Sequence, residues 1–461
     1  MTIRTDCRSE TEVRGQEQAE EHIHGICLKT GPPRRVGVEL EWLVRDARDP
    51  ALPVSRERIA AAVSLFNEDP VFIKGTAVDG RPAPDVEPEA AARLPSSSAP
   101  GVLPSGAFLT AEPGGQLELS SLPADSLADC VAATSGDLAA LRAAAASAGL
   151  ELAGYGTDPI RPPRRLLDQP RYRAMEAYFD RSGPWGRQMM CSTASVQVSL
   201  DAGDDGDGPT GYRSRWQLVH AIGPVLVAAF ANSRLRGGRV TGWRSSRQQA
   251  WAHMDPGRTR PPRVLDGNDP RDAWARYALD AELMCVRGPE TADWAAPPGV
   301  TLRDWVRGDW AYGDGGRGAA VGAPRPPTAE DLGYHLSTLF PPVRPRGHLE
   351  LRMIDAQPGD GWIVPLAVAT ALMDDPRAAD KAMAATEPLA ASGGDPWLRA
   401  AWLGPSDPAI DRASQECFTA ARGALDRMGV PAVITTAVDA FIEDYVSRGR
   451  CPADDTVEDA R

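Results

Sequence analysis

The stretch His348-Leu349-Glu350-Leu351-Arg352-Met353 alternates charged and apolar residues. Successive side chains of a β-strand point to opposite faces, so this stretch predicts a strand with one charged face and one apolar face. Three other segments of the 461-residue chain alternate in the same way: Val36–Leu43, Gln116–Ser120 and Ser195–Asp201. If the four strands share one sheet, their polar residues gather on one face and their apolar residues on the other.

The polar face of such a sheet would collect acids and an amide. They are Glu39, Glu41, Glu118, Gln197 and Glu350. Carboxylates this close would raise one another's pKa until some protonate, unless cations compensate their charge. Hard divalent cations bind oxygen ligands of this kind, and Mg²⁺ also bridges substrate phosphates. Arg352 would lie on the same face as Glu350 and could hold a phosphate or carboxylate oxygen.

A solvated sheet face is the alternative explanation of this alternation. An antiparallel sheet with one face in water alternates polar and apolar residues by default. For one strand of this kind, the solvated face would be the favoured explanation. Four strands that carry acids or amides make a metal site equally favoured. The residues alone leave both explanations open.

The composition excludes several classes of protein. The formal net charge is −13, which argues against general nucleic-acid binding, because that needs a basic surface. The seven cysteines lack C-x-x-C spacing, so we expect reduced thiols and no zinc framework. The N-terminus has no apolar signal core, and no apolar stretch approaches the roughly 18–20 residues of a membrane span. We therefore expect a cytoplasmic protein that binds neither nucleic acid nor membrane.

The pattern along the chain predicts one large domain over residues 30–448. We expect a flexible segment at 1–29 and an acidic tail at 449–461. Most of the chain after Ile363 is expected to be helical, and Gln188–Leu200 is expected to be a strand. A Gly-x-x-x-x-Gly-Lys-Ser/Thr phosphate loop does not occur in the sequence, so any nucleotide chemistry must use carboxylates, metal ions and arginines.

Several motifs occur in a fixed order along the chain. They are Gly37-Val-Glu-Leu-Glu41, Glu112 with Gln116-Leu-Glu118, Met189-Met190 with Val196-Gln-Val198, and Leu349-Glu-Leu-Arg352. The segments Ala231-Asn-Ser233, Gly242–Arg247 and Arg258-Thr259 add to them. As a linked set, these motifs resemble the plant-type glutamate–cysteine ligases, and most of all their actinobacterial branch, which opens ergothioneine biosynthesis. The resemblance covers roughly residues 30–445.

The resemblance implies an α+β, glutamine-synthetase-like fold, in which a curved antiparallel sheet forms a funnel with helices outside. It also implies the reaction. ATP would convert the side-chain carboxylate of L-glutamate to a γ-glutamyl phosphate, and the amine of L-cysteine would displace the phosphate. The products would be γ-glutamylcysteine, ADP and phosphate, and more than one Mg²⁺ ion would assist. The implied partners are therefore the small molecules L-glutamate, L-cysteine and ATP.

The resemblance also assigns roles by position in the motifs. The implied metal ligands are Glu39, Glu41, Glu112, Glu118 and Glu350, with Gln197 where some relatives carry a histidine ligand. Arg352 would act with Glu350 in catalysis by steadying the transferring phosphoryl group. Arg247, Trp251, Arg258 and Arg352 are the expected nucleotide or substrate contacts. Without the resemblance, the first three would be a surface arginine, a core tryptophan and a loop arginine.

Two features depart from the family pattern. Ser199 stands where relatives commonly have asparagine, so a polar contact there would change. The paired cysteines that give plant enzymes redox control are not evident, so we expect no regulatory disulfide. We also expect Glu350→Ala to abolish turnover and to leave the chain folded.

Other functions remain open from the sequence. A sister carboxylate–amine ligase could use the same fold with a different amine, because the cysteine pocket has no recognisable signature. A metal-dependent hydrolase could use the same acids without ATP, and nucleotide-dependent turnover separates it from a ligase. A non-catalytic protein with a retained fold is the third alternative, although nothing structural requires five glutamates on one polar face.

Overall fold

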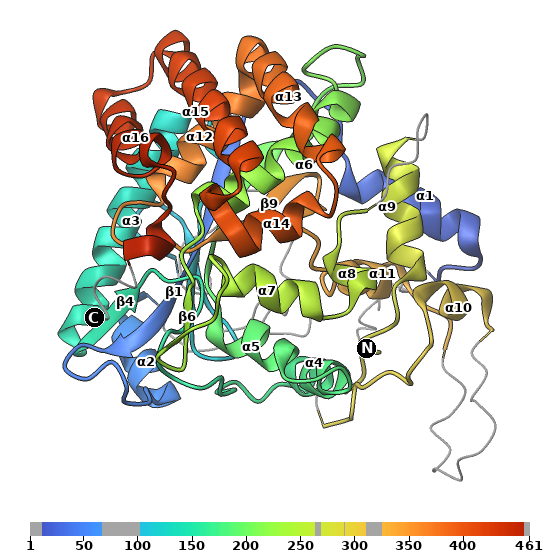
Figure 1. Ribbon diagram of the computed structural model, residues 1–461. Helices are drawn as coiled ribbons and strands as arrows, with labels where there is room; N and C mark the ends of the chain where they lie inside the picture. The colour runs from blue at the N-terminus through green and yellow to red at the C-terminus, as the bar shows by residue number, and fades with distance from the viewer. Residues whose placement is uncertain (1–11, 67–101, 263–268, 290, 310–324, 456–461) are drawn as a thin grey trace, which may run out of the picture.

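The computed structural model describes residues 12–66, 102–262, 269–289, 291–309 and 325–455, which are arranged around an antiparallel sheet (Figure 1). Its strands follow the order β2-β3-β1-β5-β9-β8, and β4 pairs with the second half of β1. The strands are β1 Val36–Asp46, β2 Phe108–Ala111, β3 Leu117–Ser120, β4 Leu150–Ala153, β5 Ser195–Asp201, β8 Val343–Pro345 and β9 His348–Asp355. A separate hairpin consists of β6 Leu235–Arg236 and β7 Arg239–Val240.

Helices make up most of the remaining described chain. They are α1 Gln16–Cys27, α2 Arg56–Val63, α3 Leu127–Ser147, α4 Pro170–Asp180, α5 Trp185–Ser192, α6 Tyr212–Ala229, α7 Ser246–His253, α8 Pro256–Thr259, α9 Pro270–Asp280, α10 Leu302–Arg307, α11 Ala329–Leu336, α12 Ile363–Asp374, α13 Pro376–Ala391, α14 Pro396–Leu403, α15 Pro408–Met428 and α16 Ala432–Asp444. In Figure 1 the C-terminal helices, orange to red, lie at the top and α4, α5 and α7 lie below them.

Asp-Pro pairs start several of these helices. At α9, α13, α14 and α15 an aspartate side chain accepts a hydrogen bond from the backbone of the first turn, and proline follows it. The aspartate satisfies a backbone N–H that has no partner within the helix, and proline at the first position needs none. These sequence pairs therefore fix where the helices begin.

The apolar face of the sheet forms the main core. Side chains such as Val38, Leu40, Val198 and Leu351 are buried there. α12 packs against β5, α6 against β9 and α3 against β1. Nearly every residue of α12 is buried, as its uniformly apolar sequence requires. The expected alternation of the four strands is thus confirmed.

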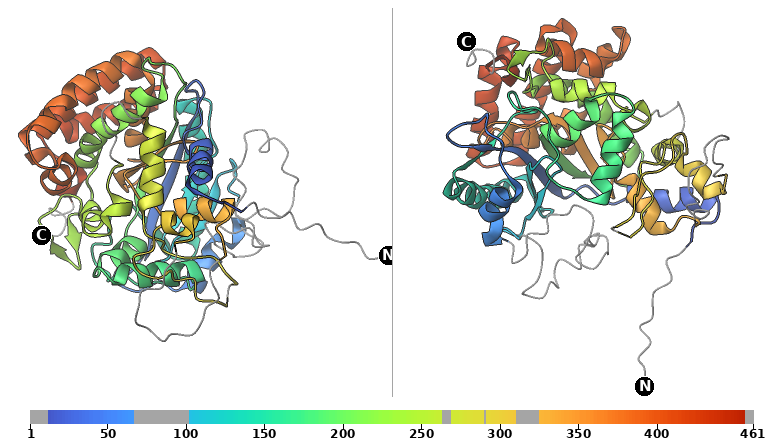
Figure 2. Two further views of the ribbon diagram at one scale, coloured as in Figure 1. Left: turned by 90° about the vertical axis from the view of Figure 1, so that its right-hand side faces the viewer. Right: turned by 90° about the horizontal axis from the view of Figure 1, so that it is seen from below.

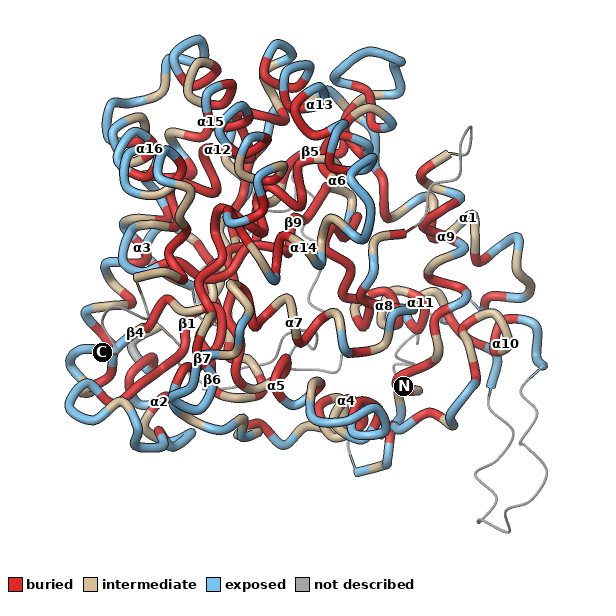
Figure 3. Tube along the Cα trace, viewed as in Figure 1, coloured by how far each residue is buried: buried red, intermediate tan, exposed pale blue. Residues whose placement is uncertain are grey.

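The polar face of the sheet is also covered. Figure 3 shows the strands red, the colour of buried residues, along much of their length. Glu118 and Gln197 are fully buried, and Glu350 is 1% exposed. A solvated face would leave such side chains open to water. That explanation of the alternation is therefore excluded for these three residues.

One expected strand is partly a helix. Residues 188–192, expected to be strand, belong to α5, and the strand β5 begins only at Ser195. Regular alternation of polar and apolar residues also begins at Ser195. Before it, Gly186 lets α5 approach α4 so closely that a β-carbon would lie 2.0 Å from the Phe179 side chain. Packing between the two helices thus replaces sheet pairing.

The chain ends extend the fold beyond the expected domain bounds. α1 packs against α9, α10 and α11 in a second apolar cluster, which lies at the right of Figure 1 and includes Ile23, Trp274 and Leu332. Residues 16–27 of the segment expected to be flexible are therefore packed. At the other end, Cys451 and Ala453 are buried. Residues 1–11 and 456–461 lie outside the described part.

Two further observations concern membranes and cysteines. Within the described ranges, no helix has both the length and the apolar character needed to cross a membrane. The six cysteines in these ranges are free thiols, and five of them are buried. The expectation of reduced thiols is consistent with this part of the chain.

Candidate active site

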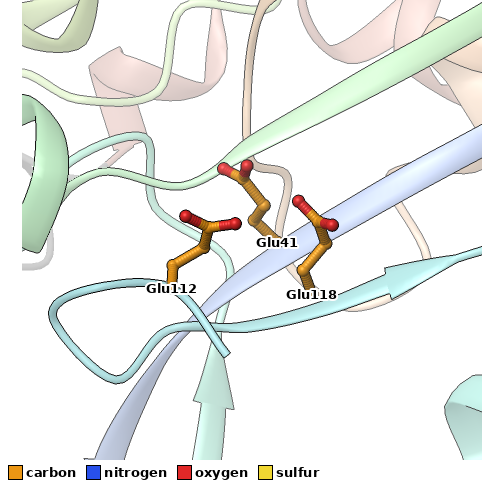
Figure 4. A group of neighbouring side chains, drawn as sticks. All are labelled: Glu41, Glu112 and Glu118. Atoms are coloured by element: carbon orange, nitrogen blue, oxygen red, sulfur yellow. The ribbon is translucent and has the colours of Figure 1, made fainter. Parts of the chain in front are cut away.

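Three of the predicted metal ligands converge at one point on the polar face. Glu41 on β1 lies directly opposite Glu118 on β3, and Glu112 comes from the turn that joins β2 to β3. One carboxylate oxygen from each lies within 4.8 Å of the others. Figure 4 shows the three carboxyl groups turned toward a shared space. A cluster of carboxylate oxygens with this spacing is a donor set that suits a hard divalent cation.

The tight turn after Glu112 brings that residue to the cluster. The backbone N–H of Gly115 donates to the carbonyl of Glu112 at 2.8 Å, and Gly115 has a φ of 87°, which favours glycine. The side chain of Gln116 fixes the turn from both sides. It accepts from Gly114 N–H and donates to the carbonyl of Thr193, at 2.9 Å each. The Pro-Gly-Gly sequence therefore forms the turn that places Glu112 beside Glu41 and Glu118.

Gln197 connects the carboxylate cluster to Arg352. Its amide nitrogen donates to Glu41 Oε1 at 3.0 Å, and its amide oxygen accepts from Arg352 Nη1. Ser195 Oγ donates to the other oxygen of Glu41 at 2.9 Å. The structure thus gives Gln197 a bridging position between an acid and a base. Its predicted role as a metal ligand remains a prediction.

Glu350 lies between two arginines. Arg344 donates to both carboxylate oxygens, from Nε at 2.6 Å and from Nη2 at 3.0 Å, and Arg352 Nη1 donates at 3.0 Å. Burial would raise the pKa of Glu350, but the charges of Arg344 and Arg352 hold it well below its usual value. Glu350 is therefore the counter-ion of two buried arginines. Its removal would take the nearest counter-charge from both arginines, and the expectation that Glu350→Ala stays folded remains a prediction.

Arg344 is a site residue that sequence reasoning missed. It lies on β8, directly opposite Glu350 on β9. β8 has only three residues, too few for alternation to predict a strand. The available signal was an arginine six positions before Glu350, in the segment that leads into the key strand.

The pKa of Arg352 depends on four glutamates of the polar face. Its burial would lower its pKa, but Glu350, Glu39, Glu41 and Glu118 together raise it. Glu39 lies opposite Gln197 on the neighbouring strand and outside the cluster of three carboxylates. The Nε of Arg352 is buried and has no hydrogen-bond partner among the described residues. This arginine is therefore a fixed cation with a donor available to a ligand.

Arg247 and Trp251 lie beside Arg352. Arg247 is buried, and its Nη2 donates to the backbone carbonyl of Arg352 at 2.7 Å. Its guanidinium lies over the Trp251 ring at 4.6 Å, and Trp251 Nε1 donates to the carbonyl of Phe340. Arg247 is thus not the surface arginine of the alternative interpretation. Both residues reach the site as predicted, although ligand contact is still a prediction.

A pocket of about 60 Å³ opens between α7 and α14. Its walls carry two indole rings and several small or apolar side chains, and arginines stand at its edges. The lining residues are Gln248, Trp251, Ala252, Thr259, Arg260, Pro261, Pro342, Arg352, Asp395, Trp397, Leu398 and Ala401. Arg352 therefore contacts both the acidic face and this pocket.

Arg258 makes its side-chain hydrogen bonds to residues outside the carboxylate cluster. It is fully buried, and its guanidinium donates to Asp255 at 3.0 Å, to Thr338 and to the carbonyl of Glu282. These contacts connect α8 to the end of α11 and to the segment after α9. They explain the burial of Arg258, and its predicted contact with a nucleotide or substrate remains a prediction.

Comparisons with known proteins show the family of the chain. The chain matches the family model described as glutamate–cysteine ligase family 2 over residues 35–459. It is 38% identical to the glutamate–cysteine ligase EgtA of Mycobacterium tuberculosis strain H37Rv, covering 97% of this chain and 90% of the relative. Identity to the EgtA of Mycolicibacterium smegmatis is 39%, covering 97% and 92%.

More distant similarities also occur. A chloroplastic glutamate–cysteine ligase of Medicago truncatula is 32% identical over 254 residues, which cover 54% of this chain and 47% of the relative. The solved structure of a glutamate–cysteine ligase from Francisella tularensis in complex with AMP has a TM-score of 0.47 and 10% identity. It covers 93% of this chain and 85% of the solved chain.

Proposed function

Because the chain belongs to glutamate–cysteine ligase family 2, we propose that it joins the γ-carboxylate of L-glutamate to the amine of L-cysteine at the expense of ATP. The observation that carries this proposal is the buried polar face, where three clustered carboxylates lie one glutamine away from Arg352. The likeness to the actinobacterial enzymes supports γ-glutamylcysteine as the product and ergothioneine biosynthesis as the pathway. A curved, funnel-like sheet of the glutamine-synthetase type is part of the same proposal.

The reaction runs in two displacements. An oxygen of the glutamate γ-carboxylate attacks the γ-phosphorus of ATP, and ADP leaves. The amine nitrogen of cysteine then attacks the acyl carbon, the C–O bond to phosphate breaks, and the amine loses a proton. Phosphoryl transfer depends chiefly on positioning and on neutralised charge. Arg352 suits this task because its guanidinium is fixed by Glu350 and Gln197 and retains an unused Nε–H.

Magnesium fits the donor set of this face. Glu41, Glu112 and Glu118 would hold an ion, since their oxygens already lie within 4.8 Å of one another. Bound Mg²⁺ would neutralise phosphate charge during transfer. Glu39 and Glu350 remain predicted ligands, and Glu350 would first have to exchange a contact with Arg344.

We assign the pocket between α7 and α14 to the amine substrate. Arg352 lines this pocket, and the carboxylate cluster contributes none of its lining residues. A nucleotide held by metal-bound phosphates would lie on the cluster side. The amine must approach the acyl carbon near Arg352, and the indoles of Trp251 and Trp397 offer favourable contacts to sulfur.

ADP release in the presence of Mg²⁺, ATP, L-glutamate and a panel of amines tests the function, with product masses recorded. Release that requires both glutamate and cysteine, with the mass of γ-glutamylcysteine, would support it. Release with another amine would make the protein a sister ligase. Absence of nucleotide turnover with every pair would favour the hydrolase or the non-catalytic alternative.

A further inference from the structure

Asp355 is a buried acid at the end of β9, three residues beyond Arg352. It is 1% exposed. Its Oδ2 accepts from the backbone N–H of Asn232 at 2.9 Å and from Ser233 Oγ at 2.6 Å, and its Oδ1 accepts from Ser245 Oγ at 3.0 Å. No step of the proposed reaction uses this carboxylate.

These contacts join three segments that are distant in sequence. Asn232 and Ser233 follow α6, Ser245 caps the start of α7, and Asp355 ends the strand that carries Arg352. Gly156 closes the fourth side so tightly that a β-carbon there would lie 2.4 Å from the Asp355 carboxyl carbon. The carboxylate therefore holds the start of α7 in register with β9.

Arg247 is the side chain that this register positions. Its backbone N–H donates to Ser233 Oγ at 3.1 Å, and its Nη2 donates to the carbonyl of Arg352 at 2.7 Å. Its Nη1 lies 3.9 Å from Asp355 Oδ1, close enough to balance charge but too far for a hydrogen bond. Neither Nε nor Nη1 of Arg247 has a hydrogen-bond partner among the described residues.

Buried donors without acceptors are costly, so a ligand that accepts hydrogen bonds from Arg247 would be bound favourably. Anionic oxygens, as in a carboxylate or a phosphoryl group, form the strongest hydrogen bonds with guanidinium N–H groups. Both classes are present in the proposed substrates, and Arg352, which faces the reaction, is the direct neighbour of Arg247.

We propose that Asp355 is a positioning residue, which through Arg247 presents two fixed N–H groups to an anionic oxygen of glutamate or of ATP. The proposal rests on the proposed ligase function. Asp355 itself touches neither substrate. Loss of Asp355 should weaken the binding of one substrate, because the Arg247 guanidinium could then move. It would remove no direct contact with that substrate.

Steady-state kinetics of Asp355→Asn, Arg247→Lys and the double variant test this inference. We expect Asp355→Asn to raise the KM of glutamate or of ATP by about 10- to 100-fold, because small misplacements of a binding group have effects of this size. A rise for glutamate identifies a carboxylate oxygen, and a rise for ATP identifies a phosphoryl oxygen. The double variant should have the same KM as Arg247→Lys alone, since both changes act through one guanidinium.

Asp374→Asn is the matched control. Asp374 pairs with buried Arg215 at 2.8 Å, away from the site, so its loss should change stability and leave both KM values unchanged. If Asp355→Asn does not fold, Ser245→Ala removes one hydrogen bond to Asp355 and should shift the same KM less. Multiplying effects in the double variant, or unchanged KM values in folded Asp355→Asn, would overturn the proposal. Wild-type protein that makes no γ-glutamylcysteine would instead refute the proposed function.

Discussion

Glu118 is a buried acid in the cluster that we propose as the magnesium site. Its side chain is fully buried, directly opposite Glu41 and close to Glu112. Three carboxylates in one place repel one another, and at Glu118 hydrogen bonds from Thr110 and Ser120 and the charge of Arg352 offset part of this repulsion. Loss of one charge should therefore affect metal binding and folding in opposite directions.

We predict that Glu118→Gln raises the Mg²⁺ concentration needed for half-maximal rate by about 10- to 100-fold, because the change removes a charged ligand and keeps its size. Rates measured against Mg²⁺ concentration test this. The thermal midpoint without Mg²⁺ should stay equal or rise. Glu151→Gln, on the exposed side of β4, is the control and should change neither quantity. An unaltered Mg²⁺ requirement in Glu118→Gln would contradict the assignment.

Glu350 is the opposite case, an acid whose removal should also weaken the fold. Three hydrogen bonds from Arg344 and Arg352 end on its carboxylate, and all three side chains are buried. Breaking a buried ion pair on one side leaves an uncompensated charge, which costs more than the pair contributes when it is intact.

We predict that Glu350→Gln abolishes turnover and lowers the free energy of unfolding by about 3–5 kcal/mol. Urea unfolding measures the second effect. Asp439→Asn is the control, because it breaks a surface pair with Arg422 and should cost at most about 1 kcal/mol. A Glu350→Gln protein as stable as wild type would show that the arginines find other compensation.

At the scale of elements, alternation predicted the strands that carry the site. The expected strand at Ser195–Asp201 is confirmed, and the strand expected at 347–354 spans His348–Asp355. The place of Glu41 and Glu118 on one sheet face follows from the same alternation, whereas Glu112 was assigned by the resemblance to the ligase family. These features are local, because a period of two residues is readable within each segment.

Features that depend on tertiary contacts could not be predicted in this way. Arg344 acts across strands, from an element of three residues. Arg258 carries the same charge as Arg247, and only the structure shows that its guanidinium donates to Asp255 and Thr338. α5 took the place of an expected strand because close packing at Gly186 involves α4, which the local pattern does not reveal.

The pairing of α7 with α14 leads to an element-scale prediction. Ala252 faces the pocket from α7 and is only partly buried, so a larger side chain can enter without disturbing the core. We expect Ala252→Phe to raise the KM of cysteine by about 10-fold and to leave the KM of ATP unchanged, since specificity pockets respond strongly to added volume.

Ala252→Ser keeps the pocket open and should behave as wild type for every substrate. Steady-state rates at varied cysteine and varied ATP separate the alternatives. A raised KM of ATP with an unchanged KM of cysteine would place the nucleotide in this pocket.

At the scale of the whole molecule, the second apolar cluster, which joins α1 to α9, α10 and α11, lies beside a buried histidine. His335 on α11 is 4% exposed, and its Nε2–H donates to the carbonyl of Ala278 on α9 at 2.9 Å. Burial, followed by the nearby charge of Arg258, lowers the pKa of His335 to about 3. The ring therefore stays neutral in the folded protein at pH values where the unfolded chain would protonate it.

This difference gives stability a pH dependence of known sign. Between pH 6.5 and about 3 the unfolded chain binds the additional proton, so the free energy of unfolding falls as pH falls through that window. From pH 7.5 to pH 5, His335 should account for a loss of about 2 kcal/mol. His335→Gln keeps a donor for Ala278 and removes the titration, so its stability should fall less over the same range. Urea unfolding of both proteins at the two pH values measures the difference. Equal losses in the two would mean that other groups cause the acid sensitivity, with His220 the next candidate, since burial lowers its pKa to about 4.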